Sequence, residues 1–231
     1  MKYKNIVSGE FVSRINRFTA NVNICGTIET VHVKNTGRCK ELLVPGCTVW
    51  LSVSDNPARK TKYDLVTVEK KRENGCPLLV NVDSMIVNDV VAEWLPGSGI
   101  FGNGAVIKRE IFYGNSRFDF MIEDNGNKTY LEVKGVTLEH DGIARFPDAP
   151  TERGVKHIGE LMNCIKNGYN AFIVFVIQMK DVDSFSPNDP MHPEFGKILR
   201  RAYEEGVKIL AMDCKVENNS IVIDRKVPIV L

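Results

Sequence analysis

A run of seven apolar residues at positions 171–177 constrains the fold of this chain more than any other stretch. It is much shorter than the ~20 apolar residues that a helix needs to cross a bilayer. A short apolar run of this kind is typical of a strand that is buried on both faces. Amphipathic helices predicted at 151–166 and 193–205 flank the run in sequence, and this alternation favours an α/β fold.

Further segments with strand-like alternation surround these helices. We expect strands at 105–113, 117–123, 129–138 and 207–216, and short extended pairs at 220–223 and 227–231. Three strands followed by helix, strand, helix and strand predict an α/β domain with a mixed central sheet. With a helix expected at 83–95, this second domain is placed at 83–231.

The first 82 residues show short alternating segments separated by turns. We expect strands at 17–24, 27–33, 48–53 and 64–69. Pro45-Gly46 and Asn56-Pro57 mark turns between them. About five short strands without a long helix predict a small OB-like β-barrel at 1–82. Such barrels often bind single-stranded nucleic acid, but many bind other ligands, so both interpretations stay open.

The charge of the chain is unevenly distributed. The net charge is only +1, but residues 1–80 carry 13 Lys and Arg against 7 Asp and Glu, whereas residues 81–231 carry 17 against 22. A basic front half suits a phosphate-binding module, although many domains differ by as much. The candidates for contact with a nucleic-acid backbone are Lys34, Arg38, Lys40, Arg59, Lys60 and Lys62. Trp50 and Tyr63 are possible stacking partners, and Trp50 fits a core position equally well.

The strongest chemical signal lies in the predicted hairpin of residues 117–138. Glu132 and Lys134 are two residues apart, so their side chains point to one face of the pleat. Asp119 on the preceding strand stands among apolar neighbours, where a charge needs a partner or a metal. Two carboxylates and a lysine that converge on one sheet face could hold a divalent cation and activate water.

This arrangement suggests roles for individual residues. Asp119, Glu132 and the carbonyl of Val133 are candidate ligands for Mg²⁺ or Mn²⁺. Lys134 could orient or help deprotonate the water, and Glu110 on the preceding strand could complete the acidic cluster. The alternative is that Glu132 and Lys134 lie on a solvated face and that Asp119 is an ion-paired structural carboxylate.

The helix predicted at 151–166 adds cations near this hairpin. Arg153 and Lys156 are neighbours at helical spacing and could contact a phosphate, or they could belong to a solvated helix face. Asp148 is more consistent with a helix start than with catalysis. His157, as a lone histidine, is more often structural than a ligand.

Several strings of this sequence resemble those of one known family. Asp119 followed by Glu132-Val-Lys134 resembles the signature of the PD-(D/E)XK nuclease superfamily. The longer strings Arg117-Phe-Asp-Phe-Met, Leu131-Glu-Val-Lys-Gly-Val-Thr-Leu138 and Phe146-Pro-Asp-Ala-Pro-Thr-Glu-Arg-Gly-Val-Lys-His157 resemble the sugar fermentation stimulation protein family, SfsA. Arg14-Ile-Asn-Arg-Phe18, Asn35-Thr-Gly37, Pro45-Gly46 and Ser54-Asp-Asn56 extend the resemblance over nearly the whole chain.

The resemblance implies an OB-like first domain, a PD-(D/E)XK-like second domain and non-specific DNA binding in the cytoplasm. The scattered cysteines, without a Cys-x-x-Cys pair, also favour a cytoplasmic protein with reduced thiols. We therefore expect a Mg²⁺- or Mn²⁺-dependent nuclease that binds DNA more readily than RNA and does not bind membranes. A non-catalytic DNA-binding regulator of sugar metabolism and a hydrolase of small phosphodiesters are the alternatives.

Overall fold

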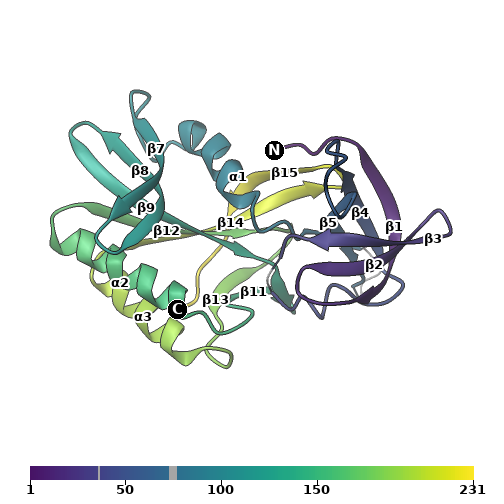
Figure 1. Cartoon of the computed structure of the whole chain (residues 1–231). Helices are drawn as coiled ribbons and strands as arrows, with labels where there is room; N and C mark the ends of the chain where they lie inside the picture. The colour runs from purple at the N-terminus through teal and green to yellow at the C-terminus, as the bar shows by residue number, and fades with distance from the viewer. Residues whose placement is uncertain (36, 73–76) are drawn as a thin grey trace.

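Strands of the N-terminal part of the chain form a sheet that closes on itself. The computed structural model describes residues 1–35, 37–72 and 77–231 (Figure 1). The sheet has the order β3-β2-β1-β4-β5-β6, and a parallel pairing of β3 with β5 closes the barrel. The strands are β1 (Ile6–Arg14), β2 (Thr19–Ile24), β3 (Thr27–Val33), β4 (Thr48–Val53), β5 (Tyr63–Lys70) and β6 (Leu78–Asn81). The predicted OB-like barrel is thereby confirmed.

A second, six-stranded sheet forms the C-terminal part in the order β15-β14-β12-β9-β8-β7. β9, β12 and β14 are parallel, and the outer pairings are antiparallel, which confirms the predicted mixed sheet. The apolar run forms β12 at the centre of this sheet, where every residue after Asn170 is buried. The strands are β7 (Val106–Tyr113), β8 (Ser116–Asp124), β9 (Asn127–Val136), β12 (Asn170–Ile177), β14 (Lys208–Glu217) and β15 (Ser220–Lys226).

Helices cover both faces of this sheet. α2 (Glu152–Lys166) and α3 (Pro193–Glu204) lie side by side on one face, and α1 (Val87–Trp94) lies on the other (Figure 1). Two separate apolar clusters follow from this layering, one that contains Ile158 of α2 and one that contains Val91 of α1. None of the helices in the described ranges has the length and apolar composition to cross a membrane.

Some element predictions differ from the structure. The helix expected at 83–95 begins only at Val87 and continues into the short 3-10 helix η1 (Leu95–Gly97), because Asp83 is buried in polar contacts with the barrel. A three-stranded sheet of β10 (Leu138–His140), β11 (Ile143–Phe146) and β13 (Ser184–Pro187) was not predicted. Residues 227–231, expected to be extended, contribute only an isolated bridge from Ile229 to Phe185.

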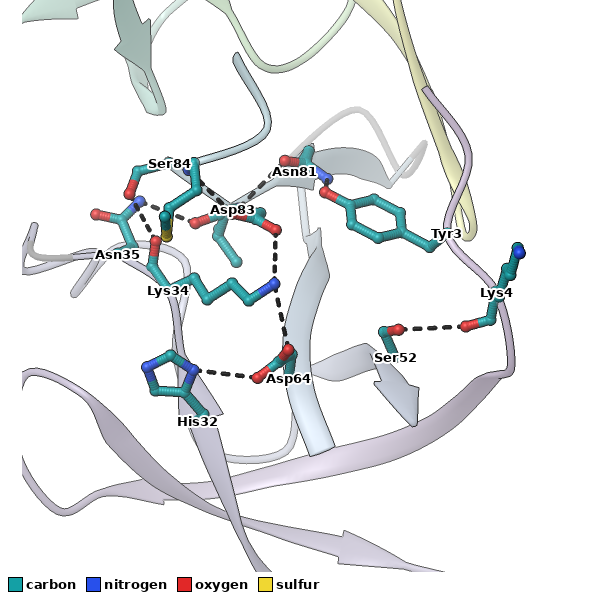
Figure 2. A network of polar contacts seen from close by, with 12 residues as sticks. Tyr3, Lys4, His32, Lys34, Asn35, Ser52, Asp64, Asn81, Asp83 and Ser84 are labelled. Atoms are coloured by element: carbon teal, nitrogen blue, oxygen red, sulfur yellow. Dashed lines mark hydrogen bonds and ion pairs between the residues drawn. The ribbon is translucent and has the colours of Figure 1, made fainter. Parts of the chain in front are cut away.

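A buried polar network joins the two parts (Figure 2). Lys34 of the barrel pairs with Asp64, at 3.2 Å, and with Asp83, at 3.3 Å. Burial opposes the ionisation of Asp64, but hydrogen bonds from Arg59 and the charge of Lys34 outweigh it and hold the pKa of Asp64 at about 2. The Gln178 amide, at the end of β12, donates to Asn81 Oδ1, at 2.9 Å, and to the Asp83 carbonyl, at 3.0 Å. Lys34 therefore links Asp64 of the barrel to Asp83, at the start of the second part.

Backbone contacts also cross between the two parts. The first residues of the chain lie along β15, where the Tyr3 amide donates to the Asn219 carbonyl at 2.8 Å. The loop after β3 approaches the segment before α2 so closely that a Cβ atom at Gly37 would lie 2.0 Å from Asp148 Oδ2. Only glycine fits at position 37 without a shift of Asp148.

Candidate functional site

Asp119 lies where the ladder between β8 and β9 ends. The paired residues run from Asp124 and Asn127 to Phe120 and Leu131. Beyond the last pair, the Val133 amide of β9 donates to a side chain: its acceptor is Asp119 Oδ2, at 2.7 Å. Asn88 of α1 donates to Asp119 Oδ1, also at 2.7 Å. Two elements thus fix this carboxylate at the surface of the central sheet.

Glu132 is the most enclosed acidic residue of the site, with 3% of its surface exposed. Its Oε1 atom accepts a hydrogen bond from Lys134 Nζ at 2.5 Å and contacts His157 Nδ1 of α2. Its Oε2 atom is buried without a hydrogen-bond partner among the residues that the structure describes. One oxygen of Glu132 is therefore fully engaged, and the other is a buried acceptor without a donor, which is costly.

The two carboxylates differ in their protonation behaviour. Burial, and then the negative charge of Glu132, raise the pKa of Asp119 to about 6. Burial also opposes the ionisation of Glu132, but the hydrogen bond from His157 and the charge of Lys134 outweigh it and lower the pKa of Glu132. The negative charge is thus concentrated on Glu132. The positive charge near Asp119 is too small to offset its burial and the repulsion from Glu132.

The oxygen atoms of this site suit a hard divalent cation. Within the described part of the chain, no group of three or more His, Cys, Asp or Glu side chains is placed to hold a metal ion. Mg²⁺ often uses only one or two carboxylates and keeps several waters. In a strand, the N–H and C=O of one residue point to the same side, so the Val133 carbonyl faces β8 as its amide does. Asp119, Glu132 and the Val133 carbonyl therefore fit such a cation, and the buried Oε2 atom of Glu132 would gain a partner.

Glu110 lies close in the sheet but makes a different contact. Its backbone, with φ of 56°, falls between the pairs Arg109–Phe120 and Ile111–Phe118, opposite Asp119. Its half-exposed carboxylate accepts from Arg117 Nε at 2.9 Å. The contacts of the described residues do not join Glu110 to Asp119 or Glu132.

α2 brings cations to the edge of the site. Its Thr151 side chain accepts from the Gly154 amide and so starts the helix where the sequence predicts. The exposed Arg153 donates from Nε to His157 Nε2 at 3.4 Å, which leaves the His157 proton on Nδ1, facing Glu132. Lys156 is exposed and donates to the Asn115 carbonyl at 2.8 Å. Arg153 thus joins the site through His157, and Lys156 holds the turn between β7 and β8.

The basic residues of the barrel divide into two groups. Lys34 and Arg59 are paired with Asp64 of β5, which uses their charge within the protein. Arg38 and Lys40 are exposed and line a groove of about 440 Å³. The other residues that line this groove are Arg14, Asn16, Arg17, Gly37, Ala149 and Pro150.

The remaining barrel candidates lie in or near the loop before β5. Lys60 and Lys62 are exposed, and Lys62 Nζ lies 5.3 Å from the centroid of the Tyr63 ring. Tyr63 itself is only 8% exposed, which leaves little of its ring for stacking, and Trp50 is half-buried. The predicted aromatic partners therefore offer little free surface.

The sequence did not predict the contact of His157 with Glu132, nor that of Asn88 with Asp119. A signal for His157 was present, because it lies four residues after Arg153 and next to Ile158 on the buried side of α2. Asn88 carries no local signal, since its partner Asp119 is 31 residues away and on another element.

Comparisons with known proteins agree in covering almost the whole chain. Residues 12–80 match the SfsA N-terminal OB domain, and residues 85–220 match the sugar fermentation stimulation protein RE domain. Sugar fermentation stimulation protein homologs of Clostridium beijerinckii and Ruminiclostridium cellulolyticum are each 52% identical to this chain. The first alignment covers 100% of this chain and of the homolog, and the second covers 99% of each. The structure of Pyrococcus furiosus SfsA in complex with Ca²⁺ superposes with a TM-score of 0.86 at 27% identity, and covers 100% of this chain and 98% of that one.

Proposed function

Since the chain belongs to the sugar fermentation stimulation protein family, we propose that it is a DNA-binding protein that hydrolyses phosphodiester bonds with a divalent cation. The reaction site consists of Asp119, Glu132 and Lys134, in the arrangement of the PD-(D/E)XK nucleases. The cation is Mg²⁺ or Mn²⁺.

One observation carries this proposal: the buried carboxylate of Glu132 and the half-buried carboxylate of Asp119 together hold more negative charge than their surroundings neutralise. Glu132 keeps a buried oxygen without a partner, and the pKa of Asp119 is raised to about 6 by burial and by the charge of Glu132. Such pairs of perturbed groups are common at functional sites. The family member from Pyrococcus furiosus was solved in complex with Ca²⁺, a cation that prefers the same kind of oxygen ligand.

The chain's own residues have separable tasks in this site. A bound Mg²⁺ or Mn²⁺ supplies Lewis-acid chemistry and lowers the pKa of a water molecule. The Lys134 ammonium, 2.5 Å from Glu132 Oε1, holds that carboxylate ionised and places a positive charge where charge develops on a phosphate. His157 and Arg153 fix the other side of Glu132.

The groove that Arg38 and Lys40 line would bind the nucleic-acid backbone. Ala149 and Pro150 also line it, and α2, which carries His157 to Glu132, begins shortly after them. A strand bound in this groove is thereby brought to the helix that borders the reaction site. Phosphate contacts of this type position DNA without reading its sequence, as expected for non-specific binding.

A cleavage assay across single-stranded, double-stranded and branched DNA and RNA tests the proposal. We expect cleavage with Mg²⁺ or Mn²⁺, none with EDTA, and none in Glu132→Gln, which keeps the shape of the side chain but not its charge. Lys134→Met should lose at least 100-fold in rate, by analogy with the loss of one charge-stabilising donor. Lys128→Met changes an exposed lysine on the same strand and should cleave normally. Cleavage at the full rate by Lys134→Met would refute the assignment.

A DNA-binding protein without turnover is the second candidate. It is favoured by the contacts of Glu132 to both Lys134 and His157, which give this carboxylate an ammonium and an imidazole as partners without a metal. Binding of DNA in EDTA, together with no cleavage of any substrate in Mg²⁺ or Mn²⁺, would support this role and exclude the first.

A further inference from the structure

The turn between β1 and β2 exposes two apolar side chains, and Asn16 and Arg17 of the same turn line the groove of Arg38 and Lys40. Both apolar residues lie in the short turn that joins these strands. Ile15 is 53% exposed and Phe18 is 52% exposed. Asn16 Oδ1 accepts from the Phe18 amide at 2.8 Å and from the Thr19 amide at 3.0 Å. These bonds hold the turn in one shape, so the Phe18 ring is presented to solvent by a fixed backbone.

Arg14 ties this turn to the rest of the groove. Its guanidinium donates to the carbonyls of Asn16 and Arg17 in the turn, and to those of Asn35 and Arg38 in the loop after β3. Its donors are thus used to bring two loops together, and its role is structural. As a result, Arg17, which adjoins Phe18, shares one groove with Arg38 and Lys40.

This combination specifies a ligand with both negative charge and exposed flat apolar surface. A DNA duplex offers phosphates but keeps the faces of its bases stacked within the helix. A single strand offers phosphates and base faces together, and base–aromatic stacking contributes about 1–3 kcal/mol per base. The loop between the first two strands is also one of the loops with which OB-type barrels contact oligonucleotides.

We infer that Phe18 is a stacking platform for an unpaired base, and that Arg17, Arg38 and Lys40 hold the phosphates of the same single strand. The inference rests on the proposed function and adds the kind of substrate: DNA that is single-stranded where it enters the groove. The stacking partner is thus a side chain that sequence reasoning did not select, in place of Trp50 or Tyr63.

Fluorescence anisotropy in EDTA tests the inference without cleavage. The probe is an end-labelled oligodeoxyadenylate of about 20 nucleotides, long enough to fill an OB-type groove. It is compared with a duplex of equal length and with a strand of equal length that consists of abasic spacers throughout. Phe18→Ala should weaken binding of the oligodeoxyadenylate about 5- to 150-fold, the range that corresponds to 1–3 kcal/mol. The same variant should bind the duplex and the abasic strand within about twofold of the unchanged protein, because neither offers a free base face.

Two further variants complete the experiment. Phe18→Trp should restore the affinity, since a larger ring also stacks. Tyr203→Ala removes an aromatic ring that is somewhat more exposed (61%) from α3, far from the barrel in Figure 1, and should bind all probes normally. Thermal unfolding of each variant is the control for an intact fold.

The possible failures are distinguishable. If Phe18→Ala loses equal affinity for the abasic strand, or matches Tyr203→Ala on every probe, stacking is refuted while DNA binding and cleavage stand. If the unchanged protein binds single strands through Phe18 but cleaves nothing in Mg²⁺ or Mn²⁺, stacking stands and the nuclease assignment falls. If the folded protein binds none of the probes, both are refuted.

Discussion

Asp119 and Glu132 show how two carboxylates in one site acquire different properties from their neighbours. Glu132 contacts an ammonium and an imidazole, and these contacts lower its pKa despite its burial. Among the described residues, Asp119 receives hydrogen bonds from the neutral Asn88 and Val133 groups alone, and its pKa is raised to about 6. Such a division suits a site that binds a cation, because the ion supplies the positive charge that Asp119 lacks.

This difference predicts that the ionised Asp119 destabilises the metal-free protein. Because the pKa is raised from 3.8 to about 6, the folded state binds the proton more tightly than the unfolded state, and stability is lost as pH rises between these values. Asp119→Asn should therefore increase the free energy of unfolding at about pH 7.5 by roughly 1–3 kcal/mol. Urea unfolding in EDTA measures the effect.

The pH dependence provides the control for this prediction. At about pH 3.5 the aspartic acid is largely protonated in both states, so the two proteins should differ little. If Asp119→Asn raises the free energy of unfolding equally at both pH values, the effect comes from packing and not from the charge. A lower free energy of unfolding near neutral pH would contradict the prediction.

At the level of elements, α2 acts as a rigid support for Glu132. The helix begins at its Thr151 cap, packs through Ile158 and Leu161 into the larger apolar cluster, and so fixes His157 against the central sheet. The chain from Arg153 through His157 to Glu132 sets which ring nitrogen faces the carboxylate. Partners of this kind orient a ligand without contacting the metal.

His157→Ala should accordingly weaken metal binding while leaving DNA binding intact. Loss of an outer-shell partner typically costs about 10- to 100-fold in metal affinity or activity. Isothermal titration with Mn²⁺ gives the affinity, and anisotropy in EDTA gives the affinity for DNA. Lys166→Ala, an exposed position at the other end of α2, is the control. Unchanged Mn²⁺ affinity in His157→Ala would show that the histidine is only structural.

The elements that could be predicted are those with strong local signals. β12 is uniformly apolar, α2 has a cap and an amphipathic stripe, and the hairpin of β8 and β9 alternates on both strands. β10, β11 and β13 are very short, and β11 pairs with a β13 that lies beyond α2 and β12 in the sequence. Pairing over that distance is decided by tertiary packing and leaves no local pattern.

The same distinction holds for the candidate site. Asp119, Glu132 and Lys134 could be selected because charges in an apolar hairpin stand out. Whether Lys34 is free could not be predicted, since its partner Asp64 reaches it only when β3 and β5 close the barrel. Arg59 pairs with the same carboxylate from five residues away, and the alternating pattern does not determine the loop between them. Exposure of Phe18 likewise depends on the shape of a turn that the alternating pattern does not determine.

The whole molecule carries a net charge of only +1, so its affinity for nucleic acid depends on where the cations are grouped on the surface. We expect Arg38→Ala and Lys40→Ala to weaken binding of all nucleic acids by similar factors, whatever their sequence. The slope of log affinity against log salt concentration should become shallower by about one for each side chain that no longer neutralises a phosphate. Lys197→Ala on α3 removes an exposed charge from another face and should leave the slope unchanged. A slope that is unaffected by both groove variants would contradict the groove as the binding surface.

The junction of the two parts has a consequence for how this chain folds. Asn81 and Gln178, which come from different sheets, bond to each other through both backbone and side chain, and Tyr3 lies along β15 at the far end of the sequence. A cut between residues 82 and 83 would leave these buried groups without partners, at about 1–3 kcal/mol each. We therefore expect the barrel and the α/β part to unfold as one cooperative unit, and neither half to be stable when expressed alone.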